Sequence, residues 1–299
     1  MKKLGFIGGG NMAEALARGL LDNHVFTPGD LVIADVDPAR RRKVGRALKV
    51  ETSADNRAVR DNAKALLIAV KPQQIDEVMT ELADGDHAET PLSARETASK
   101  RDLKAALRPA AKTPSNSSNG RLYISIAAGI TLKRLTDGLK TSRVIRVMPN
   151  APAMVGQGMA ALAGASGVSK ADETFALKIF RAVGDAVALS DERLLDAVTA
   201  LSGSGPAYFY LFVKALADSA VSEGLPAELA MRMALKTMRG AEENMRRSPL
   251  DAAELIRIVA SPGGTTEAAL RKFAEAGFSD IVASAVRAAA ERSRELGRS

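Results

Sequence analysis

A glycine-rich turn lies almost at the start of the chain, directly after a short apolar run. Residues 4–13 read LGFIGGGNMA, which contains the spacing G-x-G-x-x-A. In this pattern the first glycine permits a tight turn out of a strand, and the second lets the backbone approach a pyrophosphate. The N-terminal amides of the following helix then face the phosphates. The motif therefore predicts a nicotinamide dinucleotide as cofactor, bound by Gly8, Gly10, Asn11 and Met12.

A second apolar run, residues 31–34, ends at Asp35. A carboxylate at this position can bind the ribose hydroxyls of NAD(H), and its charge would repel the 2′-phosphate of NADP(H). The arginines at positions 40–42 follow closely and could pair with that phosphate instead. The two signals conflict, so either cofactor remains open, although Asp35 and Asp37 favour unusually good use of NADH.

Strand-like runs recur along the first half of the chain, separated by helical patterns. They lie at residues 3–7, 31–34, 65–70, 122–127 and 144–148. This alternation predicts an α/β fold with an N-terminal Rossmann-type, doubly wound parallel sheet, whose cofactor lies along the carboxyl ends of the strands. The strand exits therefore supply further cofactor-binding candidates, which are Ala69, Val70, Lys71, Pro72, Ala128, Gly129 and Asn150. Lys71 could bond a ribose or be a solvated residue before a proline-started helix.

Strand signals vanish beyond Asp191, and helical patterns run to the C-terminus. We therefore predict an all-helical C-terminal domain over residues 166–299, after a dinucleotide-binding domain over residues 1–165. The helix that starts at Pro206 carries apolar residues on nearly every face. Such a helix is expected to be enclosed by protein on all sides, and a subunit interface would provide that enclosure.

Residues 84–119 break the pattern of strands and helices. This stretch is polar, mixed in charge and rich in serine and asparagine toward its end. Such a composition has too little apolar surface to offset the entropy lost on ordering. We predict a flexible insertion that acts as a tolerated surface loop, before the strand that begins at Leu122.

Composition excludes several other functions. The chain has no cysteine, which excludes disulfides, thiolate zinc sites and a cysteine nucleophile, and no metal site is predicted. Its net charge of +7 is spread along the chain among acidic residues, and aromatics make up 4%. This pattern favours small anionic ligands over nucleic acid. The apolar stretch 207–221 is interrupted by two charges and is shorter than the ~20 residues that span a bilayer. With the first strand beginning near Met1, we expect no presequence, no membrane partner and a cytoplasmic location.

The histidine count narrows the reaction. The two histidines, His24 and His87, fall near the end of the first helix and inside the predicted insertion, where neither is placed as a catalytic acid. A dehydrogenase acting on a hydroxyl group needs an acid or base at the reacting oxygen. An imine reductase does not, because hydride delivery to a protonated C=N bond yields a neutral amine directly. The absence of an obvious acid therefore favours imine reduction, and no catalytic residue is assigned.

Two other dehydrogenase patterns are incomplete. Tyr210 and Lys214 have the Y-x-x-x-K spacing of short-chain dehydrogenases, but they lie on the core-like helix of the second domain rather than in the dinucleotide domain. The β-hydroxyacid dehydrogenase pattern G-x-G-x-x-x-K would place a lysine where Phe209 stands. Neither pattern supplies the required acid.

Three further motifs, in this order, resemble those of pyrroline-5-carboxylate reductase. They read MPNAP at 148–152, DAVTALSGSGPAY at 196–208 and SPGGTT at 261–266. The resemblance covers essentially the whole chain except the insertion, and Ala151 stands where the family usually has threonine. It implies reduction of 1-pyrroline-5-carboxylate to L-proline with NAD(P)H, the last step of proline biosynthesis. It also implies a homodimer with interlocked helical domains, often assembled into larger rings, and a nicotinamide flanked by Gly129 and Asn150, with Asn150 orienting a loop.

The segment 261–266 is suited to binding the substrate carboxylate. Gly263 and Gly264 would expose backbone amides, Thr265 and Thr266 would add hydroxyl donors, and the following helix would present its positive end. We expect these four residues and Ser261 to bind substrate. The same residues could instead form a helix N-cap after a proline-glycine turn.

The sequence therefore predicts an NAD(P)H-dependent imine reductase of proline biosynthesis. One alternative is a β-hydroxyacid or 6-phosphogluconate-like dehydrogenase, against which the missing lysine at Phe209 argues. Another is a non-catalytic nucleotide-sensing scaffold, against which the intact segment 261–266 argues.

Overall fold

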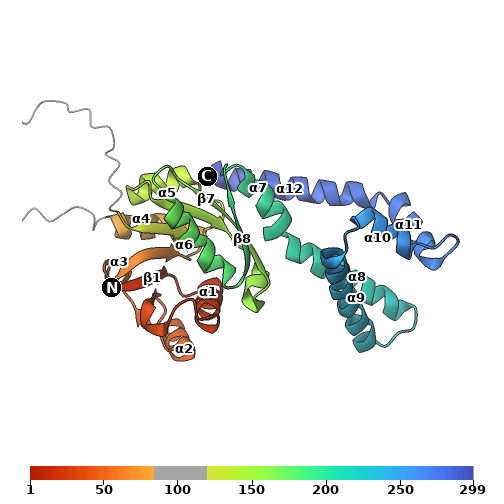
Figure 1. The fold of residues 1–299 in the computed structure, drawn as a ribbon, viewed down its shortest axis with the longest axis horizontal. Coiled ribbons are helices and arrows are strands. Elements are labelled where there is room, and N and C mark those ends of the chain that lie inside the picture. The colour runs from red at the N-terminus through yellow and green to blue at the C-terminus, as the bar shows by residue number, and fades with distance from the viewer. Residues whose placement is uncertain (84–119, 299) are drawn as a thin grey trace, which may run out of the picture. The chain divides into compact units, whose positions relative to one another are not determined.

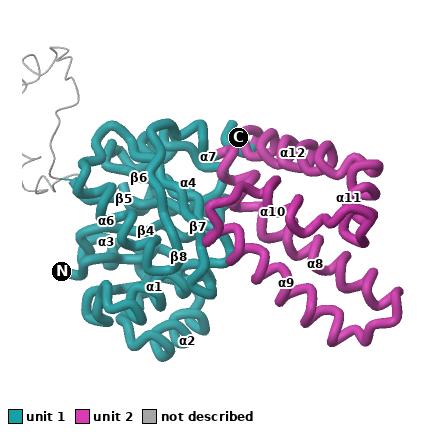
Figure 2. The backbone as a smooth tube through the Cα atoms, turned by 45° about the vertical axis from the view of Figure 1, so that its right-hand side comes forward, with its two compact units in different colours: residues 1–195, 296–299 teal, residues 196–295 magenta. Residues whose placement is uncertain are grey.

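The computed structural model describes residues 1–83 and 120–298, and the chain divides into two compact units. Unit 1 comprises Met1–Leu195 with Leu296–Ser299, and unit 2 comprises Asp196–Glu295 (Figure 2). The predicted insertion at 84–119, with His87, lies outside the described residues. Within the described ranges, no helix is long and apolar enough to cross a membrane.

Unit 1 contains an eight-stranded sheet in the order β3-β2-β1-β4-β5-β6-β7-β8. Neighbouring strands are parallel, except that β6 and β7 are antiparallel. The strands are β1 (Lys2–Ile7), β2 (Leu31–Ala34), β3 (Glu51–Ser53), β4 (Ala63–Ile68), β5 (Leu122–Ser125), β6 (Val144–Met148), β7 (Gly158–Gly164) and β8 (Gly184–Leu189). The chain reverses its winding direction at β1, and ligands bind at such a switch point. The predicted Rossmann-type sheet is confirmed (Figure 1).

Helices cover both faces of the sheet. Residues of α1, α2 and α6 pack against one face, and residues of α3, α4 and α5 against the other. The helices are α1 (Asn11–Asp22), α2 (Pro38–Leu48), α3 (Asn56–Asn62), α4 (Ile75–Ala83), α5 (Leu132–Leu139) and α6 (Lys170–Arg181), with the short 3₁₀ turns η1 (Pro28–Asp30), η2 (Pro72–Gln74) and η5 (Ala151–Val155). Central parallel strands need cover on both faces, which explains why all four residues of β2 are apolar and buried.

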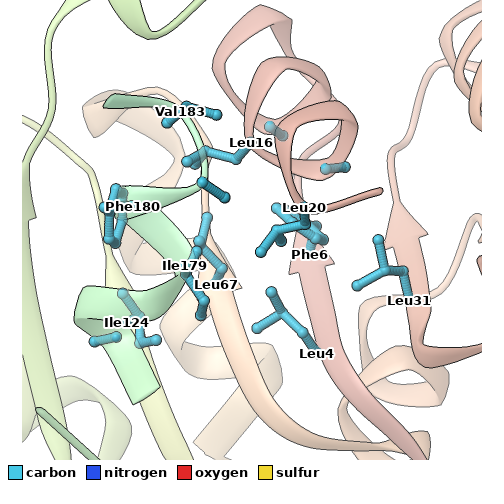
Figure 3. Packing of buried hydrophobic residues seen from close by; sticks show 14 of the residues in the cluster. Leu4, Phe6, Leu16, Leu20, Leu31, Leu67, Ile124, Ile179, Phe180 and Val183 are labelled. Carbon is cyan, nitrogen blue, oxygen red and sulfur yellow. The ribbon is translucent and has the colours of Figure 1, made fainter. Parts of the chain in front are cut away.

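The larger hydrophobic core lies between the sheet and α1, α2 and α6. Leu4 and Phe6 of β1 pack with Leu16 and Leu20 of α1, and Phe180 of α6 belongs to the same cluster (Figure 3). All five side chains are fully buried or nearly so. This packing fixes α1 against β1, and with it the glycine turn that joins them.

The first unit is larger than the sequence predicted. We placed the boundary at residue 165, but α6 and β8 continue the sheet unit to Leu195. β7 and β8 were not predicted as strands because they are rich in alanine and glycine, which have low β propensity. The boundary moves because β8 pairs with β7 inside the sheet.

Unit 2 is built from helices alone, as predicted. They are α7 (Leu194–Val198), which begins at the end of unit 1, the π-helical turn η6 (Thr199–Gly203), α8 (Gly205–Ser222), α9 (Ala227–Arg247), α10 (Ala252–Val259), α11 (Thr265–Glu275) and α12 (Phe278–Arg298), whose last residues belong to unit 1. On α8, Phe209 is 62% exposed and Leu211 69% exposed. The enclosure expected around α8 is therefore not supplied by the residues that the structure describes.

Candidate cofactor and substrate sites

The glycine turn predicted to approach a cofactor joins β1 to α1. Gly8 has a φ of +95°, and a Cβ built on it would come within 2.9 Å of the carbonyl oxygen of Ala69. The Gly8 amide donates to the carbonyl of Ala34 at 2.9 Å. The turn therefore sits against the ends of both neighbouring strands, β2 and β4, and only glycine fits its first position.

The start of α1 has the properties of an anion site. Gly10 is the N-cap residue and makes no side-chain capping bond, and no atom lies within 4 Å of the position of a Cβ built on it. The first helical bond runs from the amide of Glu14 to the carbonyl of Gly10 at 2.9 Å, so the amides of Asn11 and Met12 precede the helical ladder. Uncapped amides beside open space fit the pyrophosphate of a dinucleotide.

Asp35 ends β2 beside this turn. Its Oδ2 accepts the amide of Gly9 at 2.8 Å, and its Oδ1 accepts the amide of Asp37 at 2.8 Å. Each carboxylate oxygen can accept more than one hydrogen bond, so the group can still bind a ribose hydroxyl. Asp35 therefore also holds the glycine turn against the end of β2, a role that the sequence did not reveal.

Two of the three arginines after Asp35 are held by the fold. Arg40 donates to the carbonyl of Gly9, and its Nη2 lies 2.8 Å from Oε2 of Glu14. Arg41 donates from Nη1 to the carbonyl oxygens of Asp35 at 2.6 Å and Val36 at 3.0 Å. Both cations lie near the carboxyl end of β2, so the conflict between Asp35 and the arginines persists in the structure.

The remaining predicted cofactor residues occupy the exits of β4, β5 and β6. Lys71 is the N-cap of η2, which begins at Pro72, and the carbonyl group of Ala69 and the side chain of Val70 lie against Gly8. Ala128 and Gly129 follow β5, where Gly129 has a φ of +75°. Asn150 follows β6, and its Oδ1 accepts the amide of Met159 at 2.9 Å, so its side chain ties the loop to the start of β7. These exits share the carboxyl edge of the sheet with Gly8.

A pocket of about 450 Å³ lies elsewhere in unit 1, beside α1. It is lined by α1 together with Lys43 and residues 153–156. Of the predicted cofactor residues only Asn11 lines it. The dinucleotide site is therefore assigned from the glycine turn and strand exits and not from this pocket.

Two charged pairs at β6 were missed by the sequence reasoning. Arg146, within the strand, pairs through Nη1 with Oε1 of Glu192 at 2.6 Å. Arg143, directly before the strand, donates from Nη2 and Nε to the two carboxylate oxygens of Asp172 at 2.6 and 3.0 Å. Burial alone would raise the pKa of Asp172, but hydrogen bonds from Arg143 and Ser169 outweigh it and lower that pKa. The signal in the sequence was a single arginine inside the apolar run VIRVM, since a buried charge needs a partner.

The predicted substrate segment forms a turn and the start of α11 in unit 2. Gly263 has a φ of +69°, and Gly264 is the N-cap of α11. The amide of Gly264 donates to the carbonyl of Ser261 at 2.9 Å, and that of Gly263 to Oε2 of Glu267 at 2.6 Å. Both glycine amides are thus already bonded, which corrects the expectation that they would be exposed.

The backbone amides without a helical partner at the start of α11 are those of the two threonines. The first backbone bond at the start of α11 is from Ala268 to Gly264, so the amides of Thr265 and Thr266 precede it. The segment does form a helix N-cap after a proline-glycine turn, as the alternative predicted, but the N-cap residue is Gly264, and neither threonine hydroxyl caps the helix. Two uncapped amides and two adjacent hydroxyls at a helix N-terminus suit a carboxylate.

The two residues of the Y-x-x-x-K pattern lie on α8 in unit 2, whereas the cofactor turn belongs to unit 1. Tyr210 is 64% exposed on α8, and Lys214 of the same helix pairs with Asp218 at 2.5 Å. His24 follows α1 with a φ of +53°, beyond the end of the helix whose start faces the cofactor turn.

Comparison with known proteins agrees with this division of the chain. Residues 192–296 match the family model for pyrroline-5-carboxylate reductase dimerisation, and residues 3–92 match that for coenzyme F420-dependent NADP oxidoreductases. The chain is 38% identical to the pyrroline-5-carboxylate reductase of Synechocystis sp. over 296 residues, covering 99% of this chain and 98% of that one. The chain belongs to the pyrroline-5-carboxylate reductase family.

Solved pyrroline-5-carboxylate reductases share the whole fold. The structure of the Coxiella burnetii enzyme matches with a TM-score of 0.83 and 31% identity, covering 100% of this chain and 99% of that one. The Plasmodium falciparum pyrroline carboxylate reductase, solved with NADP bound, matches with a TM-score of 0.79 and 27% identity, covering 99% and 98%. Membership of the family confirms the resemblance inferred from the three motifs, and its dimerisation segment accounts for the exposed apolar residues of α8.

Proposed function

We propose that this chain reduces 1-pyrroline-5-carboxylate to L-proline with NADPH or NADH as hydride donor, the last step of proline biosynthesis. The observation that carries this proposal is the 38% identity to a pyrroline-5-carboxylate reductase over 99% of the chain. Full-length identity matters because it includes both the glycine turn of unit 1 and the carboxylate-suited segment of unit 2.

Unit 1 holds the cofactor in this proposal. The amides of Asn11 and Met12 bind the pyrophosphate. Gly8 and Gly10 let the pyrophosphate approach the backbone closely. Asp35 binds the adenosine ribose, residues 69–72 bind along the exit of β4, and Ala128, Gly129 and Asn150 flank the nicotinamide. The bound cofactor supplies the hydride. The uncapped start of α1 and the open space beside Gly10 support this assignment.

Unit 2 holds the substrate carboxylate. We assign this role to residues 261–266, with Ser261 and the two glycines shaping the turn and Thr265 and Thr266 donating hydrogen bonds. The support is the uncapped N-terminus of α11, where two threonine amides precede the helical ladder. A carboxylate gains there from both the helix dipole and charge-assisted hydrogen bonds.

The main task of the protein in this reaction is to position the imine carbon against the hydride donor. When the imine nitrogen is protonated, a hydride added to the imine carbon moves the C=N electron pair onto nitrogen, which becomes the neutral secondary amine. No side chain has to donate a proton at that moment, so alignment of the two reactants supplies much of the rate enhancement. This chemistry fits a chain whose one described histidine, His24, lies beyond the end of α1.

We propose further that two copies pair through the helical segment, as a homodimer that can assemble into a larger ring, in the cytoplasm and without nucleic-acid or membrane partners. The exposed apolar side chains of α8 support pairing. The cysteine-free composition is compatible with a reducing compartment.

Oxidation of NADPH by the purified chain tests the function. We expect turnover with 1-pyrroline-5-carboxylate, and none in the reverse direction with β-hydroxy acids or 6-phosphogluconate and oxidised cofactor. Turnover with the hydroxy acids would instead identify a dehydrogenase. Tight NADPH binding without turnover on any of these compounds would identify a nucleotide-sensing scaffold.

A further inference from the structure

One carboxylate in unit 1, that of Glu192, joins the start of α5 to the strand β6. Its Oε1 accepts the amide of Leu132 at 2.7 Å and the Nη1 of Arg146 at 2.6 Å. Leu132 begins α5, directly after the loop that contains residues 128–129. Arg146 lies on β6, which ends shortly before Asn150.

We propose that Glu192 is a positioning residue for hydride transfer, an inference that rests on the proposed function. By holding the start of α5 and the strand β6 on one oxygen atom, it fixes the spacing of the two loops that flank the nicotinamide. Hydride transfer is sensitive to such spacing, because a displacement of about 1 Å can cost on the order of a hundredfold in rate.

Burial makes this junction rigid. The Arg146 side chain is 10% exposed and that of Glu192 26% exposed, so each charge needs the other. The carboxylate also lies at the N-terminus of α5, where the helix dipole favours a negative charge. A carboxylate so held has little freedom to let the two segments drift apart.

The loop that contains residues 128–129 is also contacted by residues near the C-terminus. Gly129 has a φ of +75°, and a Cβ built on it would come within 2.9 Å of the Cβ of Leu296. A Cβ on Gly297 would lie 3.5 Å from the Cγ2 of Thr131. The loop is therefore packed by the chain end at Gly129 and anchored by Glu192 at Leu132, as expected of a loop whose position matters.

The Arg143–Asp172 pair provides a matched control. It joins the same region of β6 by the same chemistry, with 2.6 Å between Nη2 and Oδ1, and it is also partly buried. Arg143, however, precedes the strand, whereas Arg146 lies at the centre of the strand and shares the Glu192 carboxylate with the start of α5. Loss of the Arg143–Asp172 pair should destabilise unit 1 without moving the loops that flank the nicotinamide.

The experiment compares Glu192→Gln with Asp172→Asn in the full-length protein. Both changes keep the side-chain shape and remove one charge from an arginine pair. For Glu192→Gln we expect kcat to fall about tenfold, the isotope effect with NADPH deuterated at the transferred position to rise, and amide hydrogen exchange in residues 128–135 to accelerate without cofactor. For Asp172→Asn we expect a lower Tm, with the isotope effect and that exchange as in the parent.

A double variant, Arg146→Met with Glu192→Leu, guards against misfolding because it leaves no unpaired charge. We expect it to fold and to show the same reduced kcat and raised isotope effect. The inference is overturned when Glu192→Gln or the folded double variant keeps the parent's kcat, isotope effect and exchange while the parent reduces 1-pyrroline-5-carboxylate. A parent without that activity refutes the proposed function itself.

Discussion

The two units differ in how far their apolar side chains are exposed to solvent. In unit 1 most leucines, isoleucines and phenylalanines of the sheet and its helices are buried, as Leu4 and Phe6 illustrate. In unit 2 comparable residues remain open, and Leu211 and Ile258 are 69% and 65% exposed. Burial of apolar surface drives folding, so a unit that leaves this much exposed is completed by another surface.

The difference in burial indicates that unit 1 is stable within a single chain, whereas unit 2 depends on assembly. Unit 1 closes its own core and can present the cofactor site as a property of a single chain. Unit 2 matches a dimerisation family, and its segment 261–266 lies within the matched region. We therefore expect cofactor binding to be insensitive to assembly, and turnover to depend on it.

The largest effect is expected from breaking assembly at α8. Leu211→Asp should dissociate the oligomer and lower turnover by on the order of a hundredfold, because a charge buried in an apolar interface costs several kcal/mol. NADPH binding should persist. Sedimentation, NADPH fluorescence titration and kinetics on one sample measure all three, and the exposed Lys214→Gln on the same helix is the control. An assembled and fully active Leu211→Asp protein would remove α8 from the interface.

The next effect sharpens the role of unit 2 in substrate binding. If the Thr266 hydroxyl donates to the substrate carboxylate, Thr266→Ala should lower kcat/KM by about 1.5 to 3 kcal/mol, or roughly ten- to a hundred-and-fifty-fold. The Tm should stay near that of the parent because the hydroxyl caps no helix in this structure. Unchanged kinetics with 1-pyrroline-5-carboxylate would place the carboxylate elsewhere.

A smaller effect sharpens the role of unit 1 in cofactor choice. Asp35→Asn keeps an oxygen that can accept the Gly9 amide but removes the charge that would repel a 2′-phosphate. We expect the ratio of kcat/KM for NADPH over that for NADH to rise about tenfold, equivalent to about 1.4 kcal/mol. Asp251→Asn, on the exposed cap of α10 in unit 2, is the control. Equal ratios in parent and Asp35→Asn would remove Asp35 from the ribose pocket.

The smallest effect concerns the pH dependence of unit 1. The pKa of Asp172 is lowered in the folded state, although burial alone would raise it, because hydrogen bonds from Arg143 and Ser169 prevail. Its contribution is therefore complete above the unfolded pKa of about 3.9 and is lost as the pH falls through the lower folded value. The Tm difference between parent and Asp172→Asn should be constant near neutral pH and shrink below about pH 4. A difference that stays constant down to about pH 2 would contradict the direction of this pKa shift.

Much of unit 1 could be predicted from the sequence. The strands at 31–34 and 144–148 have the predicted bounds, because short apolar runs that contain valine and isoleucine favour strands. The run GMAALAG at 158–164 escaped prediction because small residues carry little strand preference, and its role as a strand comes from pairing with β6 and β8.

The candidate sites were predictable only where a local motif encodes them. The glycine turn and the segment 261–266 are local motifs, so the sequence could single out their residues as candidates. The ties from Asp35 to Gly9 and from Glu192 to Arg146 join positions far apart in the chain, and no spacing rule relates them. The acceptors of the glycine amides at 263 and 264 are near in the sequence, but these bonds depend on the conformation of the turn, which the motif alone does not specify.

Transfer of deuterium tests the central claim most directly. The purified chain would receive 1-pyrroline-5-carboxylate and NADPH deuterated at the transferred position of C4, and the product would be analysed by mass spectrometry and NMR. Our account predicts L-proline that carries one deuterium on Cδ, the carbon of the former imine. Proline without the label, or NADPH that stays reduced in the presence of 1-pyrroline-5-carboxylate, would contradict it.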